Sequence, residues 1–208
     1  MSVSEDRTLQ ESTTTVPPSG IADPAPLGLA AFAATTFLLS AANAGWMNSA
    51  TTAVFLGYAF AYGGLCQLLA GMWEFRNRNV FGATAFSSYG GFWIGIGLWA
   101  VLVAPHATVL QATHDKGWIL LTFAIFNTYM LILSTQVNLA VFGVFLTLEV
   151  TEIVGFIGLL GNHATIIKAS GIIGVITAVV AWYASAAAAS RGLAGGKIRF
   201  PVGPALVR

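Results

Sequence analysis

Two carboxylates stand in the middle of a long apolar run, FLTLEVTEIVGF at residues 145–156. Glu149 and Glu152 are three residues apart, so on a helix both would project from nearly the same face. Ionisable side chains inside an apolar span are rare and usually mark functional sites. The pair could move a proton or serve as a general acid and base. Because no nucleophile or metal-ligand cluster accompanies them, the pattern favours proton handling over an enzymatic reaction.

The low dielectric expected around such a pair limits its charge. Two ionised carboxylates one turn apart would repel each other and would also repel a passing anion. We therefore expect at least one of them to be protonated near neutral pH, with the pair titrating as a unit. A protonated glutamate can donate a hydrogen bond to an anion, and its ionisation would close the site to anions. The alternative is a structural pair that bonds to Thr122, Asn127 or Tyr129 on a neighbouring helix, or that faces another protomer.

The composition points to a membrane. Of 208 residues, 56% are hydrophobic and 8% are charged, whereas soluble domains carry about 25% charged residues. Six apolar stretches are long enough to cross about 30 Å of hydrocarbon as helices. They lie near residues 25–46, 50–73, 84–104, 117–136, 139–161 and 165–189. The sequence therefore predicts an all-α integral membrane protein, a small bundle of six transmembrane helices.

The two ends of the chain differ from the bundle. Residues 1–22 are polar and rich in Ser, Thr and Pro, which predicts a disordered tail before a transmembrane domain over residues 23–190. With six spans, this tail and a C-terminal tail over residues 191–208 fall on one side. That side carries seven of the nine basic residues, and Lys116 and Lys168 fall on the other. Since basic residues favour the cytoplasmic side, we expect both termini in the cytoplasm and the protein in the cell membrane, surrounded by lipid.

Several kinds of ligand are not expected. The formal net charge of +1 and the scattered basic residues offer no patch for a nucleic acid. The single cysteine, Cys66, excludes an intrachain disulfide and a cysteine metal cluster. The sequence shows no nucleotide-binding loop and no signalling domain. We therefore expect no cofactor and no metal, and neither an enzyme nor a membrane sensor.

The first span begins with an unusual stretch, DPAPLGL at residues 23–29. We expect Asp23 to cap the helix and Pro24 to occupy the first helical position, where its missing N–H costs no hydrogen bond. Four side chains further along are spaced to share one helix face: Phe32, Thr36, Ser40 and Asn43. This face is partly polar inside an apolar span, so it could line a path across the membrane.

Three motifs resemble the acetate uptake transporter family, the succinate–acetate permeases. DPAPLGL is similar to the family's Asn-Pro-Ala-Pro-Leu-Gly-Leu signature at the start of the first helix. YGGLCQLLAGMWEF at residues 62–75 resembles its Tyr-Gly-Gly-x-x-Gln segment and the Ala-Gly-x-x-Glu that follows. FGATAFSSYGGFW at residues 81–93 is similar to the start of its third helix. The resemblance covers nearly everything from residue 23 to residue 190.

The resemblance implies an architecture and a substrate. It implies a bundle similar to the urea channels that assembles as a homo-hexamer, with one pore in each protomer. It also implies passage of acetate and related short carboxylates, succinate among them, together with a proton. The apolar constriction of the family is implied at Phe32, Tyr89 and Leu148. Such a constriction admits a dehydrated small acid and blocks bulk water.

A carboxylate inside a membrane needs donors that replace its water. The motif residues and the polar side chains of the spans are the candidates for the substrate path: Asp23, Pro24, Pro26, Leu27, Gly28, Thr36, Asn43, Tyr62, Gln67, Ser87, Ser88 and Asn127. Each polar member could instead form a hydrogen bond between helices.

Two features depart from the family pattern. Asp23 replaces the family's Asn, and Glu149 and Glu152 are not among its hallmarks. An acid at a helix N-terminus is favourable for the helix, but it would repel an anion that arrives there. These acids keep open a second hypothesis, a channel for a small neutral or cationic solute such as urea, an amide or ammonium.

Overall fold

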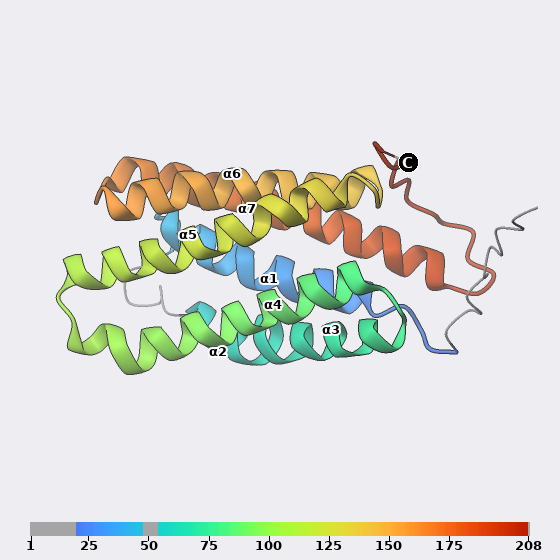
Figure 1. Ribbon diagram of the computed structural model, residues 1–208, viewed down its shortest axis with the longest axis horizontal. Helices are drawn as coiled ribbons and strands as arrows, with labels where there is room; N and C mark the ends of the chain where they lie inside the picture. Colours follow the sequence, from blue (N-terminus) through green and yellow to red (C-terminus); the bar gives the residue numbers. More distant parts are fainter. Residues whose placement is uncertain (1–19, 48–53, 208) are drawn as a thin grey trace, which may run out of the picture.

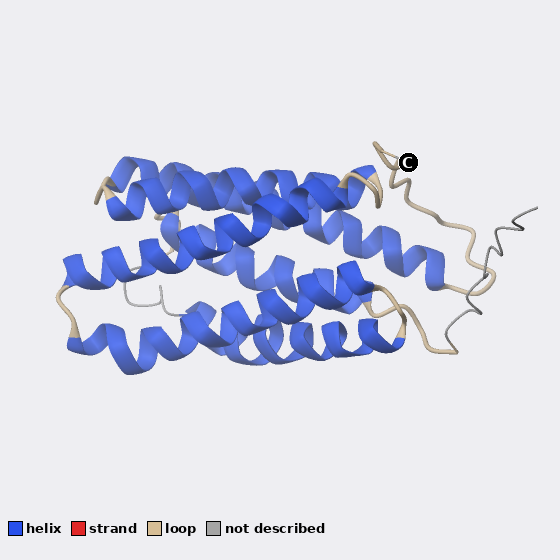
Figure 2. Cartoon of the chain, viewed as in Figure 1, coloured by secondary structure: helices blue, strands red, loops and turns tan. Residues whose placement is uncertain are grey.

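The computed structural model describes residues 20–47 and 54–207, and every regular element in these ranges is a helix (Figures 1 and 2). The elements are α1 (Ala25–Asn43), α2 (Phe55–Phe60), the π-helical η2 (Ala61–Cys66), α3 (Gln67–Arg76), α4 (Val80–Leu98), the π-helical η3 (Trp99–Val103), the 3₁₀ turn η4 (Ala104–His106), α5 (Val109–Ser134), α6 (Leu139–Leu160) and α7 (Ala164–Gly192). The disorder predicted for residues 1–22 falls mostly outside the described ranges.

In the described part of the chain, these helices make six segments that are long and apolar enough to cross a membrane. α2, η2 and α3 continue as one segment, Phe55–Arg76, and α4, η3 and η4 continue as another, Val80–His106. The shortest segment has 19 residues, and crossing the hydrocarbon takes about 20. The predicted fold, an all-α bundle of six transmembrane helices, is confirmed.

The fourth span begins earlier than the sequence predicts. α5 starts at Val109 instead of near residue 117, because Thr108 and Gln111 form a capping box. The Thr108 hydroxyl accepts from the Gln111 N–H, and the Gln111 side chain accepts from the Thr108 N–H at 2.9 Å. The cap satisfies two N–H groups that would otherwise be unpaired. The polar residues 114–116 therefore extend the helix, and Lys116 is a helical residue instead of a loop residue.

The start of α1 is shifted by one residue from the prediction. The N-cap is Pro24 instead of Asp23, and the helix begins at Ala25 with Pro26 in its first turn. Asp23 still contributes to the cap, because its Oδ1 accepts from the Ala25 N–H at 2.9 Å. The prolines fix where the helix begins, as expected, since neither has an N–H that the first turn would leave unpaired.

Close helix packing depends on glycines at two positions of the second segment. α1 lies between α7 and the α2–α3 segment (Figure 1). A Cβ added to Gly63 would overlap Thr35 of α1, and one added to Gly71 would overlap Ser87 of α4. Small residues let the helix backbones approach in this way. The packing places the polar face of α1 inside the bundle.

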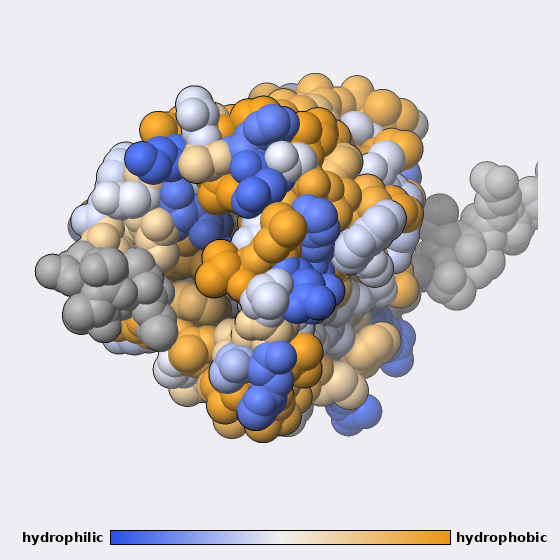
Figure 3. All heavy atoms as spheres, turned by 90° about the vertical axis from the view of Figure 1, so that its left-hand side faces the viewer, coloured by the Kyte–Doolittle hydropathy of each residue, from blue (hydrophilic) through white to orange (hydrophobic). Residues whose placement is uncertain are grey.

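The described ends of the chain lie at the same end of the bundle (Figure 1). After α7, residues 193–207 run back across that end. The Ala140 N–H donates to the Val202 carbonyl at 2.9 Å, and the Leu206 N–H donates to the Thr135 carbonyl at 2.8 Å. The C-terminal segment is thus attached to the ends of α5 and α6. Figure 3 shows the opposite end face, where hydrophilic residues gather with apolar residues along much of the rim.

Candidate functional site

A row of cavities runs through the bundle, and we name each for one residue that lines it. The Glu74 cavity, of about 260 Å³, lies at the end that carries the chain termini. The Gln67 cavity, of about 30 Å³, follows it, and the Lys116 cavity, of about 60 Å³, lies beyond. The first two share four wall residues: Leu29, Ala85, Phe86 and Phe145. Neighbouring cavities thus adjoin, and the row extends from one end of the bundle past its middle.

The three apolar residues of the implied constriction lie together between two of these cavities. Phe32, Tyr89 and Leu148 are the residues that line both the Gln67 cavity and the Lys116 cavity. All three are buried. The rings of Phe32 and Tyr89 meet edge to face, with their centroids 5.5 Å apart. The three side chains therefore form the wall that separates the two cavities.

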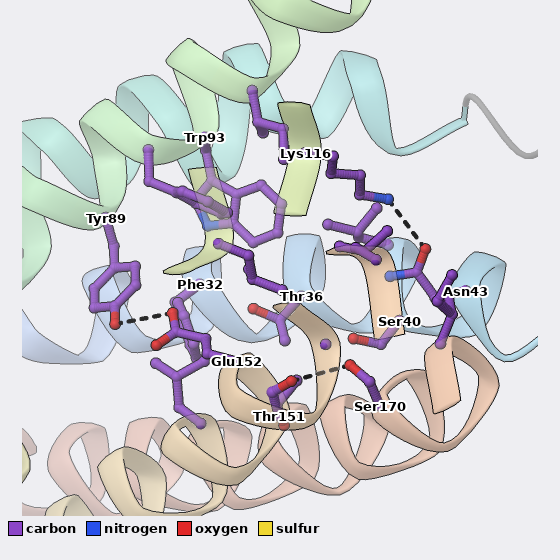
Figure 4. A pocket seen from close by; sticks show the side chains of 18 residues that line it. Phe32, Thr36, Ser40, Asn43, Tyr89, Trp93, Lys116, Thr151, Glu152 and Ser170 are labelled. Carbon is purple, nitrogen blue, oxygen red and sulfur yellow. Dashed lines mark hydrogen bonds between the residues drawn. The ribbon is translucent and has the colours of Figure 1, made fainter. Parts of the chain in front are cut away.

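The polar face of α1 lines the Lys116 cavity. All four residues of the predicted face lie along it: Phe32, Thr36, Ser40 and Asn43 (Figure 4). α4, α5, α6 and α7 supply the remaining walls. The Thr36 hydroxyl is buried and has no hydrogen-bond partner among the described residues. A buried hydroxyl without a partner is costly, so it marks a place where a polar ligand or water would gain a hydrogen bond.

Glu149 lies in a hydrogen-bond network between α5 and α6. Its carboxylate accepts from Asn127 Nδ2 at 2.7 Å and from the Thr128 hydroxyl at 2.8 Å. Asn127 Nδ2 also donates to the Phe145 carbonyl at 3.0 Å. Of the structural partners weighed from the sequence, Asn127 is present; Thr122 donates to the Trp118 carbonyl instead. Glu149 thus has the surroundings of a structural residue.

Glu152 lies at the wall of the Lys116 cavity. One of its oxygens lies 3.3 Å from the Tyr89 hydroxyl. The other, Oε2, is buried and finds no hydrogen-bond partner in the described part of the chain. Leu148, one turn earlier on α6, lines the same cavity, so the two share the face that their spacing predicts. Glu152 therefore has one carboxylate oxygen available to a ligand in the cavity.

Some candidate path residues lie away from these cavities. Ser87 and Ser88 line a groove between α4 and α5, where Gly91 and Gly95 have open space beside them. Asn127 is fully buried in the Glu149 network. Tyr62 is half-buried in η2 and lines none of the three cavities. Gln67, in contrast, is buried at the wall of its cavity, and its Oε1 has no partner among the described residues.

The residues of the first motif lie near the Glu74 cavity, but they do different things. Asp23 lines this cavity together with Glu74 and Arg191. The Pro26 carbonyl accepts from the Ser185 hydroxyl at 2.7 Å, which ties α1 to α7. Gly28 packs against the Phe86 ring so closely that a Cβ would overlap it. Pro24 caps the helix, and Leu27 is 45% exposed. Most of the motif therefore positions α1, and Asp23 alone among these five lines the cavity.

Three residues of the cavities were missed by the sequence reasoning. Glu74 is fully buried, and its Oε1 has no partner in the described part of the chain. The sequence signal for Glu74 was the Ala-Gly-x-x-Glu segment of the second motif, in which it is the glutamate. Trp93, whose buried Nε1 also lacks a partner among the described residues, lines the Lys116 cavity. Lys116 lines the same cavity, and it was missed because the start of α5 was placed too late in the chain.

Comparisons with known proteins place this geometry in a family. The model of the GPR1/FUN34/yaaH family matches residues 6–194. Acetate permease A of Emericella nidulans is 40% identical over 177 residues, covering 78% of this chain and 59% of that protein. Ammonia transport outward protein 2 of Saccharomyces cerevisiae is 37% identical over 184 residues, covering 85% of this chain and 64% of that protein. The chain thus spans about three fifths of the length of these fungal relatives.

A solved structure matches over nearly its full length. The structure of the bacterial acetate channel SatP superposes with a TM-score of 0.80 at 31% sequence identity. The match covers 88% of this chain and 99% of that one.

Proposed function

Because the chain belongs to the GPR1/FUN34/yaaH family, we propose that it is a membrane transporter or channel for acetate and related short monocarboxylates. The membership confirms the resemblance indicated by the three sequence motifs. The chain is a multi-pass membrane protein, and its described residues form six apolar helical spans. Since the curated fungal relatives are longer, the substrate is proposed from the residues of this chain as well as from its relatives' names.

The proposal is carried by the position of Phe32, Tyr89 and Leu148. The three side chains implied at the family constriction are those that line both the Gln67 and the Lys116 cavities. An apolar wall of this kind would let a small dehydrated acid pass and would hold back bulk water. The Thr36 hydroxyl, a donor without a partner among the described residues on the Lys116 side of the wall, would replace part of the water that the carboxylate loses.

Within this function, Glu152 is proposed as the proton-coupling residue and Glu149 as a structural one. Tyr89 has one hydroxyl proton, and the Asn127 oxygen 3.0 Å away can only accept. With that proton given to Asn127, the 3.3 Å contact between Tyr89 and Glu152 needs a proton from Glu152. This supports a protonated Glu152, whose single proton bonds to Tyr89 and would pass to a carboxylate only in exchange for that contact. Ionisation of Glu152 would then repel the anion, so flux should be higher at acidic pH.

A second candidate function is passage of a neutral or cationic solute such as urea or ammonium. The observation that favours it is the Glu152 carboxylate, whose free oxygen would accept a hydrogen bond from an amide or an ammonium. One of the fungal relatives is named as an ammonia transport protein. Lys116 in the same cavity would oppose a cation.

The test is uptake of labelled acetate, urea and ammonium into liposomes that contain the pure protein, with and without a pH gradient. We expect acetate uptake that an inward proton gradient accelerates. Protein-free liposomes correct for diffusion of undissociated acetic acid across lipid. Uptake of urea or ammonium in the absence of protein-dependent acetate uptake would replace the proposal with the second candidate.

The orientation and assembly are also proposals. The basic residues Arg76, Arg78, Arg191, Lys197 and Arg199 belong to the terminal end of the bundle, which supports cytoplasmic termini. Labelling single cysteines at Thr113 and Lys197 in a Cys66→Ser background tests this, because an impermeant reagent should reach Thr113 in intact cells. If the reagent reaches the cysteine at position 197 and not the one at position 113, the termini lie outside the cell and the proposed orientation is wrong.

A homo-hexamer with a pore in each protomer is proposed from the family resemblance. The open groove beside Gly91 and Gly95 on the flank of α4 supports it, since small residues favour helix contacts between protomers. Native mass spectrometry should give six copies, and a monomer as the sole species would contradict the proposal.

A further inference from the structure

Lys116 stands where the Lys116 cavity meets the far end face of the bundle. A groove at that end, which we call the end groove, is lined by the end of the third span, the first turns of α5 and the facing ends of α6 and α7. Lys116, Leu159 and Ile167 line both the cavity and the end groove. A solute that moves between the end groove and the cavity would therefore pass the Lys116 ammonium.

The ammonium is held in place but keeps donors free. Lys116 Nζ donates to Asn43 Oδ1 at 3.2 Å, so α1 and α5 together fix its position (Figure 4). An ammonium has three N–H donors, and this bond uses one. In Figure 4, Lys116 and Asn43 lie at one end of the cavity, and Glu152 and Tyr89 lie at the other. Among the described residues that line the cavity, Lys116 is the basic residue and Glu152 the acidic one.

The polar atoms nearby point to the same class of ligand. Trp93 Nε1 and the Thr36 hydroxyl are buried on the cavity wall and lack partners among the described residues. Trp99 Nε1, on the wall of the end groove, also lacks one there. An indole N–H can only donate, and a hydroxyl can donate. A fixed cation accompanied by unpartnered donors suits an anion with several acceptor atoms, such as a carboxylate.

We propose that Lys116 is the residue that binds the carboxylate group of the substrate at the far end of the path. The inference rests on the proposed function for the identity of the substrate, a short monocarboxylate. Asn43 orients the ammonium, and the methyl end of the acid lies against the apolar wall that Leu159 and Ile167 provide. Lys116 thereby selects the ionised acid over an uncharged amide of the same shape, and it disfavours a cation.

Two measurements test this site. Binding of ¹³C-labelled acetate and acetamide to the detergent-purified protein is followed by NMR line broadening, and acetate uptake is measured in liposomes. The variants are Lys116→Gln, which can still bond to Asn43, and Lys116→Arg, which keeps the charge. The matched control is Lys168→Gln, which removes the exposed lysine on the same end of the bundle.

We expect Lys116→Gln to weaken acetate binding about tenfold, in line with the loss of a charged hydrogen-bond donor. Its half-saturating acetate concentration for uptake should rise by a similar factor, and acetate should lose its advantage over acetamide. Lys116→Arg and Lys168→Gln should stay within about twofold of the parent protein.

Acetate binding by Lys116→Gln as tight as by the parent, or an equal loss in Lys168→Gln, would overturn the inference. So would a parent protein that binds no acetate. If the parent binds acetate through Lys116 but does not move it, the site stands and the proposed transport function fails.

Discussion

Glu149 and Glu152 lie one turn apart on α6, yet they belong to two different regions of the molecule. Glu149 completes a closed network, with both carboxylate oxygens taken by Asn127 and Thr128. Glu152 faces the Lys116 cavity, with one oxygen near Tyr89 and the other without a partner among the described residues. Two glutamates of one helix thus differ: Glu149 is structural, and Glu152 is available to a ligand.

The difference comes from the helix geometry. Residues three apart differ by about 60° around a helix, so the face that they share is broad enough to span two neighbours. α6 packs on α5 and α7, and its turn places Glu149 toward α5 and Glu152 toward the cavity. Spacing alone therefore predicts that two carboxylates are close, but it does not predict that they share one environment. The surrounding residues decide which of them can act.

The largest expected effect is a loss of stability when the hydrogen-bond network of Glu149 is disrupted. Asn127→Leu keeps the branched shape of the side chain but removes the amide that bonds to Glu149, Tyr89 and the Phe145 carbonyl. Glu149 would lose one of its two hydrogen-bond donors, and we expect a loss of about 3 kcal/mol of stability. Thermal unfolding in detergent measures it. A variant as stable as the parent would show that the Glu149 network is not structural and would remove the contrast.

The next effect concerns the wall between the cavities. Leu148 is the neighbour of Glu149 in sequence but faces the Glu152 side, so Leu148→Ala should join the Gln67 and Lys116 cavities. We expect uptake to extend to larger acids such as lactate and succinate, and Phe32→Ala should act in the same direction.

Leu146→Ala is the matched control for the wall, because Leu146 is on the same helix and 42% exposed. It should keep the parent's substrate range. If Leu148→Ala and Phe32→Ala also keep that range, the three side chains do not form the narrow point.

A smaller effect is expected on the stability of the protein when each glutamate is replaced by glutamine. Glu149→Gln places an amide N–H₂ against the donors of Asn127 or Thr128, which should cost about 1 kcal/mol. Glu152→Gln has room in the cavity and should stay within about 0.5 kcal/mol of the parent. Comparing the two melting temperatures at one pH checks this. Equal losses in both variants would argue that Glu152 is as much part of the packing as Glu149.

The sequence predicts the fold and one wall of the site well. The six spans follow from apolar length, and the face of Phe32, Thr36, Ser40 and Asn43 follows from helical spacing; the structure places all four on one cavity. The trio Phe32, Tyr89 and Leu148 needed the family resemblance, because nothing in their spacing brings three different helices together. Their role as the narrow point of the path remains a prediction.

The parts that could not be predicted depend on helix ends and on partners from distant helices. Lys116 was assigned to a loop, because a polar stretch after an apolar span looks the same whether it ends a helix or begins one. Its pairing with Asn43 spans 73 residues of sequence. Ser87 and Ser88 were expected on the path because they are polar, but the rotation of α4 turns them to the groove beside α5.

The central claim is that Glu152, and not Glu149, couples a proton to passage of the acid. The most direct measurement is initial acetate uptake in liposomes between about pH 5 and pH 8, for the parent, Glu149→Gln and Glu152→Gln, each after subtraction of the uptake by protein-free liposomes at the same pH. The account predicts that the parent and Glu149→Gln lose protein-dependent flux as the pH rises, while Glu152→Gln keeps its flux across the range. An unchanged pH profile in Glu152→Gln, at normal incorporation into the liposomes, would contradict it.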